Sequence, residues 1–391
     1  MKKWISLALA VIAVAAIALI VRFFVTTPAL IDSAQNRVVP VALNVTPEAQ
    51  ALHATLDVAD MHADSLLWKR DLLERQDRGH IDLPRLIEGR FALQVFSSVT
   101  KSPKGQNFDA NSGDTDTITQ LAMVDLQPVR TWRSLLQRSL YHAEKLHDFA
   151  ERSGGRLRVI TTPDDIDSLL ADRKAGTTVV GGLLSVEGLH NLEGDITNLD
   201  VLYAGGFRMA GLTHFFDNDI AGSMHGIQKG GLTPLGHAAV QRMERLGMIV
   251  DIAHASHAAV AEVLAMATRP VVSSHGGVQA ICKVNRNLSD DEIRGVAKTG
   301  GVIGIGFWHG AVCGTSPNKI VQAMIHVRDL VGVDHVGLGS DFDGSTTTGF
   351  DASRVAAITQ ALMDAKFSED DIRKVMGGNV LRVLRAGLAP G

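Results

Sequence analysis

Short apolar stretches alternate along the chain with longer segments in which apolar residues recur every three or four positions. Eight of the short stretches have the length and the β-branched or glycine-bounded composition of buried strands. They lie at residues 57–62, 91–99, 179–186, 207–213, 248–253, 270–274, 301–307 and 335–339. Strands that alternate with helices form parallel sheets with right-handed crossovers. The pattern therefore predicts the α/β class, and eight strands fit a closed (β/α)8 TIM barrel.

Helices are predicted in the longer segments that separate these strands. They lie at residues 117–152, 163–174, 234–246, 257–267, 289–299, 317–331, 352–364 and 368–386. The sequences TPDD at 162–165 and SDDE at 289–292 indicate helix starts, because a capping Thr or Ser is followed by acidic residues in the first turn. No GxGxxG motif follows the first strand, which argues against an open dinucleotide-binding sheet.

The first 25 residues follow a different pattern. Lys2 and Lys3 precede an almost unbroken apolar run from Trp4 to Val21. About 20 apolar residues span the hydrocarbon core of a bilayer, and no convincing cleavage site follows the run. We therefore favour an uncleaved transmembrane anchor over a signal peptide, whose removal would give a secreted protein. The charge bias leaves the lysines in the cytoplasm and the remainder outside it, in the periplasm or at the cell surface.

Three parts are predicted along the chain. An anchor or signal sequence at 1–25 is followed by a polar, proline-containing tether at 26–48 and by the barrel at 49–391. Of the 391 residues 46% are hydrophobic and 20% charged, with a formal net charge of −4. This composition excludes a disordered chain and a basic nucleic-acid-binding surface. Cys282 and Cys313 are compatible with one disulfide in an oxidising compartment or with two buried thiols.

Six of the eight predicted strands end in a histidine or a carboxylate. The residues concerned are His62 with Asp64, Glu187, His214, His254, His275, and Asp341 with Asp343. The C-terminal ends of the strands form the face on which TIM barrels build their active sites. A lone histidine is more often structural, but a ring of such residues around one face predicts a metal site.

The ligand types narrow the chemistry of this predicted site. Imidazole nitrogen and carboxylate oxygen, without thiolate, suit Zn²⁺ or a similar divalent ion. Four or five ligands around Glu187 are too many for one catalytic ion with an open position. A glutamate can instead bridge two ions about 3.5–4 Å apart that hold a hydroxide for hydrolysis. Arg286, after the sixth strand, is either a surface arginine or a bidentate partner of a substrate carboxylate, and Asp341 is the candidate general acid/base.

The order and spacing of these motifs resemble the membrane (renal) dipeptidases, peptidase family M19 of the amidohydrolase-like metal-dependent hydrolases. The resemblance extends from about Val58 to Leu384. It rests on the segments DMHAD, SVEGLH, GLTHFFDN, GLTPLGHAAVQRMERLGMIVDIAHAS, SSHGGVQAICKVNRN and HVGLGSDFDG. It implies a zinc-dependent dipeptidase that hydrolyses small dipeptides through a metal-bridging hydroxide, including some with a C-terminal D-residue. A homodimer is a further expectation.

By this resemblance the site holds two Zn²⁺ ions per chain. His62, Asp64 and the bridging Glu187 would bind one ion. Glu187, His254 and His275 would bind the other.

The resemblance also implies how a dipeptide is held. His214 would hold the carbonyl oxygen as it becomes an oxyanion, and Arg286 would bind the C-terminal carboxylate. Asp341 would move the proton from the bridging water to the leaving amine. Cys282 matches a family cysteine that pairs with one about thirty residues further on, so Cys313 is the expected partner, which supports export.

Two other functions remain open. The same site could cleave another small carboxylated amide or a lactone, or the barrel could bind metal or peptide without turnover. The complete ligand set argues against binding without turnover, because a site that has lost its catalytic activity usually loses a ligand. A tyrosine that helps to bind substrate in vertebrate members has no clear counterpart, and Trp308 and His309 occupy that part of the sequence.

Overall fold

Eight parallel strands close into a barrel in the computed structural model, which describes residues 2–390. They are β2 (Val58–Ala63), β3 (Phe91–Val99), β5 (Val180–Glu187), β6 (Phe207–Gly211), β7 (Ile249–Asp251), β8 (Val272–Ser273), β9 (Val302–Ile305) and β10 (Val336–Leu338). The pairings β10–β2 and β3–β5 close the ring. The predicted α/β class and (β/α)8 barrel are confirmed. A short strand that was not predicted, β4 (Leu157–Val159), pairs with the start of β5.

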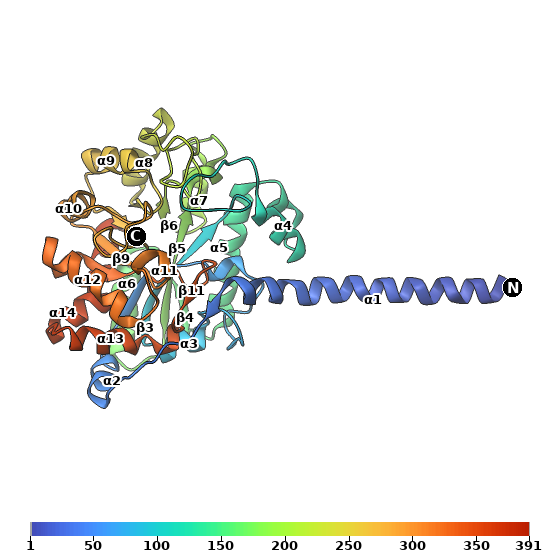
Figure 1. Ribbon diagram of the computed structural model, residues 1–391, viewed down its shortest axis with the longest axis horizontal. Helices are drawn as coiled ribbons and strands as arrows, with labels where there is room; N and C mark the ends of the chain where they lie inside the picture. Colours follow the sequence, from blue (N-terminus) through green and yellow to red (C-terminus); the bar gives the residue numbers. More distant parts are fainter. Residues whose placement is uncertain (1, 391) are drawn as a thin grey trace.

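Helices surround the barrel (Figure 1). They are α2 (Pro47–His53), α3 (Leu83–Glu88), α4 (Thr117–Val124), α5 (Leu135–Arg152), α6 (Pro163–Lys174), α7 (Asn198–Ala204), α8 (Pro234–Leu246), α9 (His257–Met266), α10 (Asp290–Lys298), α11 (His309–Val312), α12 (Pro317–Val331), α13 (Ala356–Asp364), α14 (Glu369–Arg373) and α15 (Asn379–Gly387). Both predicted caps are present, since the Thr162 and Ser289 side chains accept hydrogen bonds from the third residues of α6 and α10.

The long helix predicted at 117–152 is wrong in one respect. It is divided into α4, the short 3₁₀ helix η2 (Val129–Trp132) and α5. Pro128 lies at the break, and a proline disfavours helical backbone at the residue before it. A separate helix, α5, therefore begins at Leu135, after its cap residue Ser134.

Residues along the whole of β2, β3 and β5 are buried. This is the pattern of parallel strands with both faces covered, by the barrel interior on one side and by helices on the other. Charged groups at the ends of such strands lie away from bulk water, and they need partners other than solvent.

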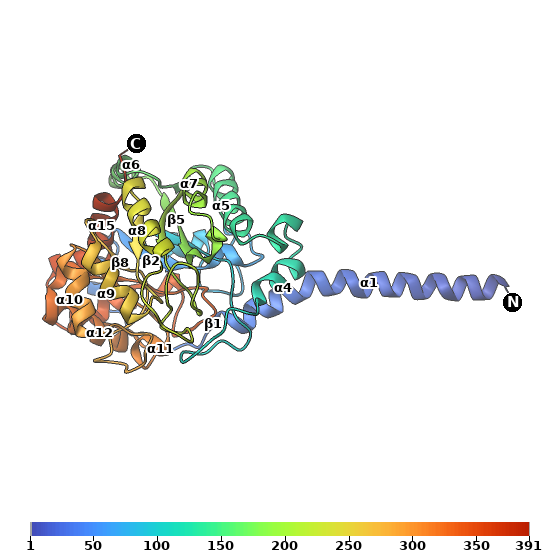
Figure 2. The ribbon, with the colours of Figure 1, turned by 90° about the horizontal axis from the view of Figure 1, so that it is seen from above.

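Helix α1 (Lys2–Gln35) projects from the domain as a single rod (Figure 1, Figure 2). Its most apolar window has a mean hydropathy of 2.8, so by length and composition it fits a membrane anchor or a signal sequence. The helix continues through the first ten residues of the predicted tether at 26–48. Two of the later tether residues form the strand β1 (Arg37–Val38), which pairs with β11 (Thr347–Thr348).

Candidate metal centre and active site

Five predicted ligands converge at the C-terminal ends of the barrel strands. Glu187 lies at the centre, and its Oε1 atom is 2.9 Å from Nε2 of His254 and 3.1 Å from Nε2 of His275. Its other oxygen, Oε2, is 3.6 Å from Nε2 of His62, which in turn lies 3.4 Å from Oδ2 of Asp64. All five side chains are buried. The two oxygens of Glu187 therefore face two different sets of ligand atoms.

Three overlapping groups of residues in this cluster could hold a metal ion. They are His62, Glu187 and His275; Glu187, His214 and His254; and His62, Asp64 and Asp341. Within each group the ligand atoms lie within 4.8 Å of one another. Glu187 and His62 each belong to two of the groups, so the three groups share ligands around one buried cluster.

Several buried polar atoms in the cluster have no hydrogen-bond partner within the protein. They are both ring nitrogens of His62, Oδ1 of Asp64 and Nδ1 of His254. A buried polar atom without a partner costs about 1–3 kcal/mol, and such atoms in a native site point to a ligand. Imidazole nitrogens and carboxylate oxygens without thiolate are the donor set of a divalent first-row ion. The residues present therefore fit a metal cofactor.

The charges in the cluster favour an ionised central glutamate. Burial alone would raise the pKa of Glu187, but His214, His62 and the other imidazoles outweigh it and hold that pKa well below its ordinary value. Burial raises the pKa of Asp341 well above its ordinary value, with His62 and Arg286 opposing this and Asp64 and Glu187 adding to it. Burial thus favours the protonated form of the Asp341 carboxyl group.

Two histidines are oriented by groups that the sequence analysis missed. Ser274 Oγ donates to Asp251 and lies 2.8 Å from Nδ1 of His275. The Nδ1 atom of His214 lies 3.2 Å from the carbonyl oxygen of Lys101. Such contacts fix the ring orientation of metal-binding or catalytic histidines. The only sequence signal for Asp251 was its place as a charged residue within the apolar strand predicted at 248–253.

A cavity of about 250 Å³ lies over the cluster. Its polar wall includes Asp64, Glu187, His214, His254, Arg286 and Asp341, and its apolar wall includes Leu67, Val99, Phe108, Ile118, Phe215 and Trp308. Arg286 is buried, and its Nη2 atom donates to the carbonyl oxygen of His275 over 2.7 Å. Of the two open interpretations of Arg286, the structure therefore excludes a surface arginine. Trp308 and His309 also line this cavity.

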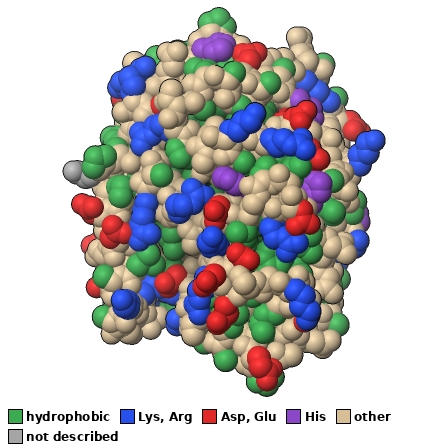
Figure 3. All heavy atoms as spheres, turned by 90° about the vertical axis from the view of Figure 1, so that its left-hand side faces the viewer, with side chains coloured by type: hydrophobic (Ala, Val, Ile, Leu, Met, Phe, Trp, Pro, Cys, Tyr) green, Lys and Arg blue, Asp and Glu red, His purple; other side chains and the backbone are tan. Residues whose placement is uncertain are grey.

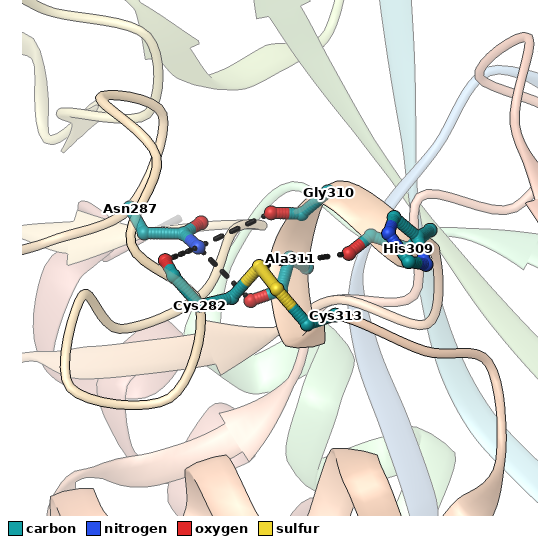
Figure 4. Close-up of a disulfide and its surroundings, with 6 residues drawn as sticks. All are labelled: Cys282, Asn287, His309, Gly310, Ala311 and Cys313. Carbon is teal, nitrogen blue, oxygen red and sulfur yellow. Dashed lines mark hydrogen bonds between the residues drawn. A yellow bond between two sulfur atoms is a disulfide. The ribbon is translucent and has the colours of Figure 1, made fainter.

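A disulfide joins the loops on the Arg286 side of the cavity. Cys282 and Cys313 are bonded, with their Cα atoms 5.3 Å apart (Figure 4). Beside the disulfide, the Asn287 side chain donates to the carbonyl oxygens of Cys282, Gly310 and Ala311 (Figure 4). The residue next to Arg286 is thereby tied to α11, the short helix that follows β9.

Asp341 lies in a strained loop. The φ angles of Asp341, Asp343 and Ser345 are 57°, 62° and 57°. Left-handed backbone costs a non-glycine residue roughly 1–2 kcal/mol, and it persists only where the surrounding structure imposes it. His254 has the same conformation, with φ 64°.

A segment that begins in α1 holds this loop. We call residues 32–41 the N-terminal strap. Its β1 strand pairs with β11, and its Asn36 Oδ1 accepts a hydrogen bond of 3.0 Å from the backbone of Ser345. Asp32, which is buried, forms an ion pair of 3.0 Å with Arg70, and Arg70 pairs in turn with Asp343 at 2.6 Å.

Replacing Asp32 with alanine is expected to lower the free energy of unfolding by about 3 kcal/mol, because it leaves part of a buried guanidinium unpaired. For a domain of this size the thermal midpoint should fall by roughly 4 °C. Asp77→Ala is the matched control, since Asp77 is exposed and also pairs with an arginine, Arg78. Thermal unfolding of the full chain measures both. Equal midpoints for the two variants would contradict the role given to Asp32.

A (β/α)8 barrel with a buried histidine–carboxylate cluster at its catalytic face defines a class of metal-dependent hydrolases. Comparison with known proteins narrows this class. The sequence model of the membrane dipeptidases, peptidase family M19, matches residues 46–388, and the chain belongs to this family. Membership implies a metal cofactor and a dipeptide substrate.

Relatives of known sequence and structure agree with this assignment. Dipeptidase tcpJ of Claviceps purpurea (strain 20.1) is 32% identical over 321 residues, covering 78% of this chain and 69% of that protein. Dipeptidase aclJ of Aspergillus oryzae is 30% identical over 365 residues, which cover 88% of this chain and 80% of that protein. The probable dipeptidase PvdM from Pseudomonas aeruginosa has the same fold, with a TM-score of 0.72 and 22% identity. The match covers 87% of this chain and 97% of that one.

A metallopeptidase from Rhodobacter sphaeroides, solved with a phosphinate mimic of the dipeptide L-Ala-D-Ala, also has this fold. Its TM-score is 0.70 and its identity 23%, with coverage of 85% of this chain and 99% of that one. At this identity the likeness supports the fold.

Proposed function

We propose that this protein is a membrane-anchored, extracytoplasmic dipeptidase that uses two Zn²⁺ ions bridged by Glu187. The observation that carries the proposal is the position of Glu187. One of its oxygens faces His254 and His275, and the other faces His62 beside Asp64. His62, Asp64 and Glu187 would bind one ion, and Glu187, His254 and His275 the other.

The protein's own residues would set the geometry around a bound metal. When bound, two Zn²⁺ ions would lower the pKa of a water molecule and polarise the scissile carbonyl. Burial of Glu187 and the three histidines keeps bulk water away from these groups, and low-dielectric surroundings strengthen every charge interaction there. The orienting contact of Ser274 with His275 keeps one ligand nitrogen aimed at the cluster.

Three further residues would act on the dipeptide. The Arg286 guanidinium is buried at the cavity wall, and a C-terminal carboxylate would accept its remaining hydrogen bonds. The Nδ1 atom of His214 can only donate to the Lys101 carbonyl, so Nε2 would stabilise the carbonyl oxygen as negative charge develops only with His214 as an imidazolium, in which both ring nitrogens donate. Asp341 would carry the proton to the leaving amine, a role that suits a carboxyl group whose pKa is raised by burial.

The proposed location of the barrel rests on helix α1. Helix α1 would cross the membrane with Lys2 and Lys3 in the cytoplasm, leaving the barrel outside. The Cys282–Cys313 disulfide supports this side, since disulfides persist in oxidising compartments.

Substrate assays test the proposed reaction. The purified full chain would be given L-L and L-D dipeptides, N-acyl amino acids and lactones, each with and without a chelator. We expect hydrolysis of dipeptides that stops on chelation and returns with Zn²⁺. Turnover of acyl amino acids or lactones without any dipeptide turnover would show that the substrate is different. No turnover of any compound by the Zn²⁺-loaded protein would favour a binding function.

Arg286→Lys is expected to raise KM for dipeptides by about tenfold or more, because lysine keeps the charge but loses the paired hydrogen bonds to a carboxylate. The value of kcat should change much less. Arg294→Lys, at an exposed position of α10, is the control. An unchanged KM in Arg286→Lys would show that Arg286 does not bind the substrate carboxylate.

A further inference from the structure

The folded domain begins very close to the end of the apolar stretch of α1. Side chains from Lys3 to Phe23 are exposed, and Pro28 is the first residue of the helix that the domain buries. The apolar run ends between Val21 and Val25, which is three to seven residues from Pro28, or about 5 to 10 Å along a helix axis. The headgroup layer on each side of a bilayer is about 5–8 Å thick. Any part of the domain level with Pro28 therefore lies at or within the headgroup layer.

Helix α4 is the element that lies beside α1 at this level. Ile31 of α1 packs against a cluster that includes Ile118 and Leu121 of α4. In both views α4 lies next to α1 and closer to its free N-terminal end than the barrel strands do (Figure 1, Figure 2).

The end of α4 and the turn after it, residues 123–133, have an unusual surface. We call this segment the α4 tip. The exposed fractions of Met123, Leu126 and Val129 are 41%, 58% and 58%. Among the described residues from 40 to 390, the other large hydrophobic side chains that are exposed are Val201 and Ile227.

The exposed charged residues within the α4 tip are basic, although one of them, Arg130, pairs with Glu144 of α5. Its exposed residues include Arg130 and Arg133, whereas its one acidic residue, Asp125, is buried. The face of the domain turned away from α1 is different, with acidic and basic side chains interspersed (Figure 3). Apolar side chains flanked by arginine are typical of segments that lie in a membrane interface.

We propose that the α4 tip inserts Met123, Leu126 and Val129 into the headgroup region of the bilayer that α1 spans. The domain then has a second membrane contact, which rests on the membrane anchoring under the proposed function. Because Ile118 of α4 also lines the catalytic cavity, this contact would hold the cavity beside the membrane surface in a fixed orientation.

Depth-dependent fluorescence quenching tests the contact on the full chain. Both native cysteines are in the disulfide, so Leu126→Cys or Val129→Cys provides a single thiol for an NBD label. The labelled protein is placed in nanodiscs of phosphatidylcholine and phosphatidylglycerol that carry a spin label on the headgroup. Asp291→Cys, on α10 at the far end of the domain, is the exposed control. Ile12→Cys, with spin-labelled acyl chains, reports on α1.

We expect quenching at positions 126 and 129 to be at least about threefold stronger than at position 291, as for a segment buried in the interface. Equal quenching at 126 and 291, with position 12 quenched, would overturn the contact and leave the anchor intact. An unquenched position 12 would overturn the anchor and the contact together. In a second arm, Leu126→Glu with Val129→Glu should reduce quenching of a label at Met123→Cys while dipeptide hydrolysis is unchanged. Undiminished quenching would contradict the contact.

Discussion

Glu187→Gln is expected to lower kcat/KM for dipeptides by at least about a thousandfold, since the two-ion site should lose several kcal/mol of transition-state stabilisation. Glutamine offers one oxygen and one NH₂ group where Glu187 offers two oxygens. Whichever way the amide turns, an NH₂ group faces ligand nitrogens of His254 and His275 or of His62. At least one ion should then be lost.

Two measurements on the same preparation check this expectation. Steady-state kinetics gives kcat/KM, and elemental analysis gives metal per chain. Glu144→Gln is the charge-matched control, because Glu144 is an exposed partner of Arg130 and does not line the cavity over the cluster. Full activity in Glu187→Gln with an unchanged metal content would contradict the bridging role.

Asp341→Asn is expected to lower kcat by about 10²–10⁴-fold, the usual contribution of a general acid/base. Asparagine has nearly the same shape but cannot carry a proton to the leaving amine. Both KM and metal content should change little, because Arg286 and the proposed ligands are untouched.

The metal content also separates two roles that Asp341 could have. Its Oδ1 atom lies 3.9 Å from Nε2 of His62, close enough to belong to a ligand group. Loss of one ion in Asp341→Asn would make Asp341 a ligand. Unchanged hydrolysis with two ions bound would show that Asp341 does not take part in the reaction.

Local sequence patterns were sufficient to predict most strands and helices of the barrel. A strand buried on both faces must be almost continuously apolar, so all eight stretches were visible in the sequence. Helices α8 and α12 have the predicted bounds, and their starts were clear because Thr-Pro and Ser-Pro pairs mark them. The strand β4 was missed because three residues carry too little periodicity, and the break at Pro128 was masked by amphipathic segments on both sides.

The convergence of the candidate ligands could be predicted because each lies at or just after the C-terminal end of a predicted strand, and these ends meet in a barrel. What supports the ring could not be predicted in the same way. The ion-paired series Asp32, Arg70 and Asp343 joins residues that are 38 and 273 positions apart, and no local spacing signals it. The same holds for Ser274, whose contact with Asp251 depends on the pairing of β7 with β8.

Titration of the metal-free protein with Zn²⁺ tests the metal centre most directly. The full chain would be stripped with a chelator, and hydrolysis of a dipeptide that it cleaves would be followed as Zn²⁺ is added in known amounts. We expect no activity without metal and a plateau at two ions per chain. A plateau at one ion, or full activity in the metal-free protein, would contradict a dipeptidase built on two ions bridged by Glu187.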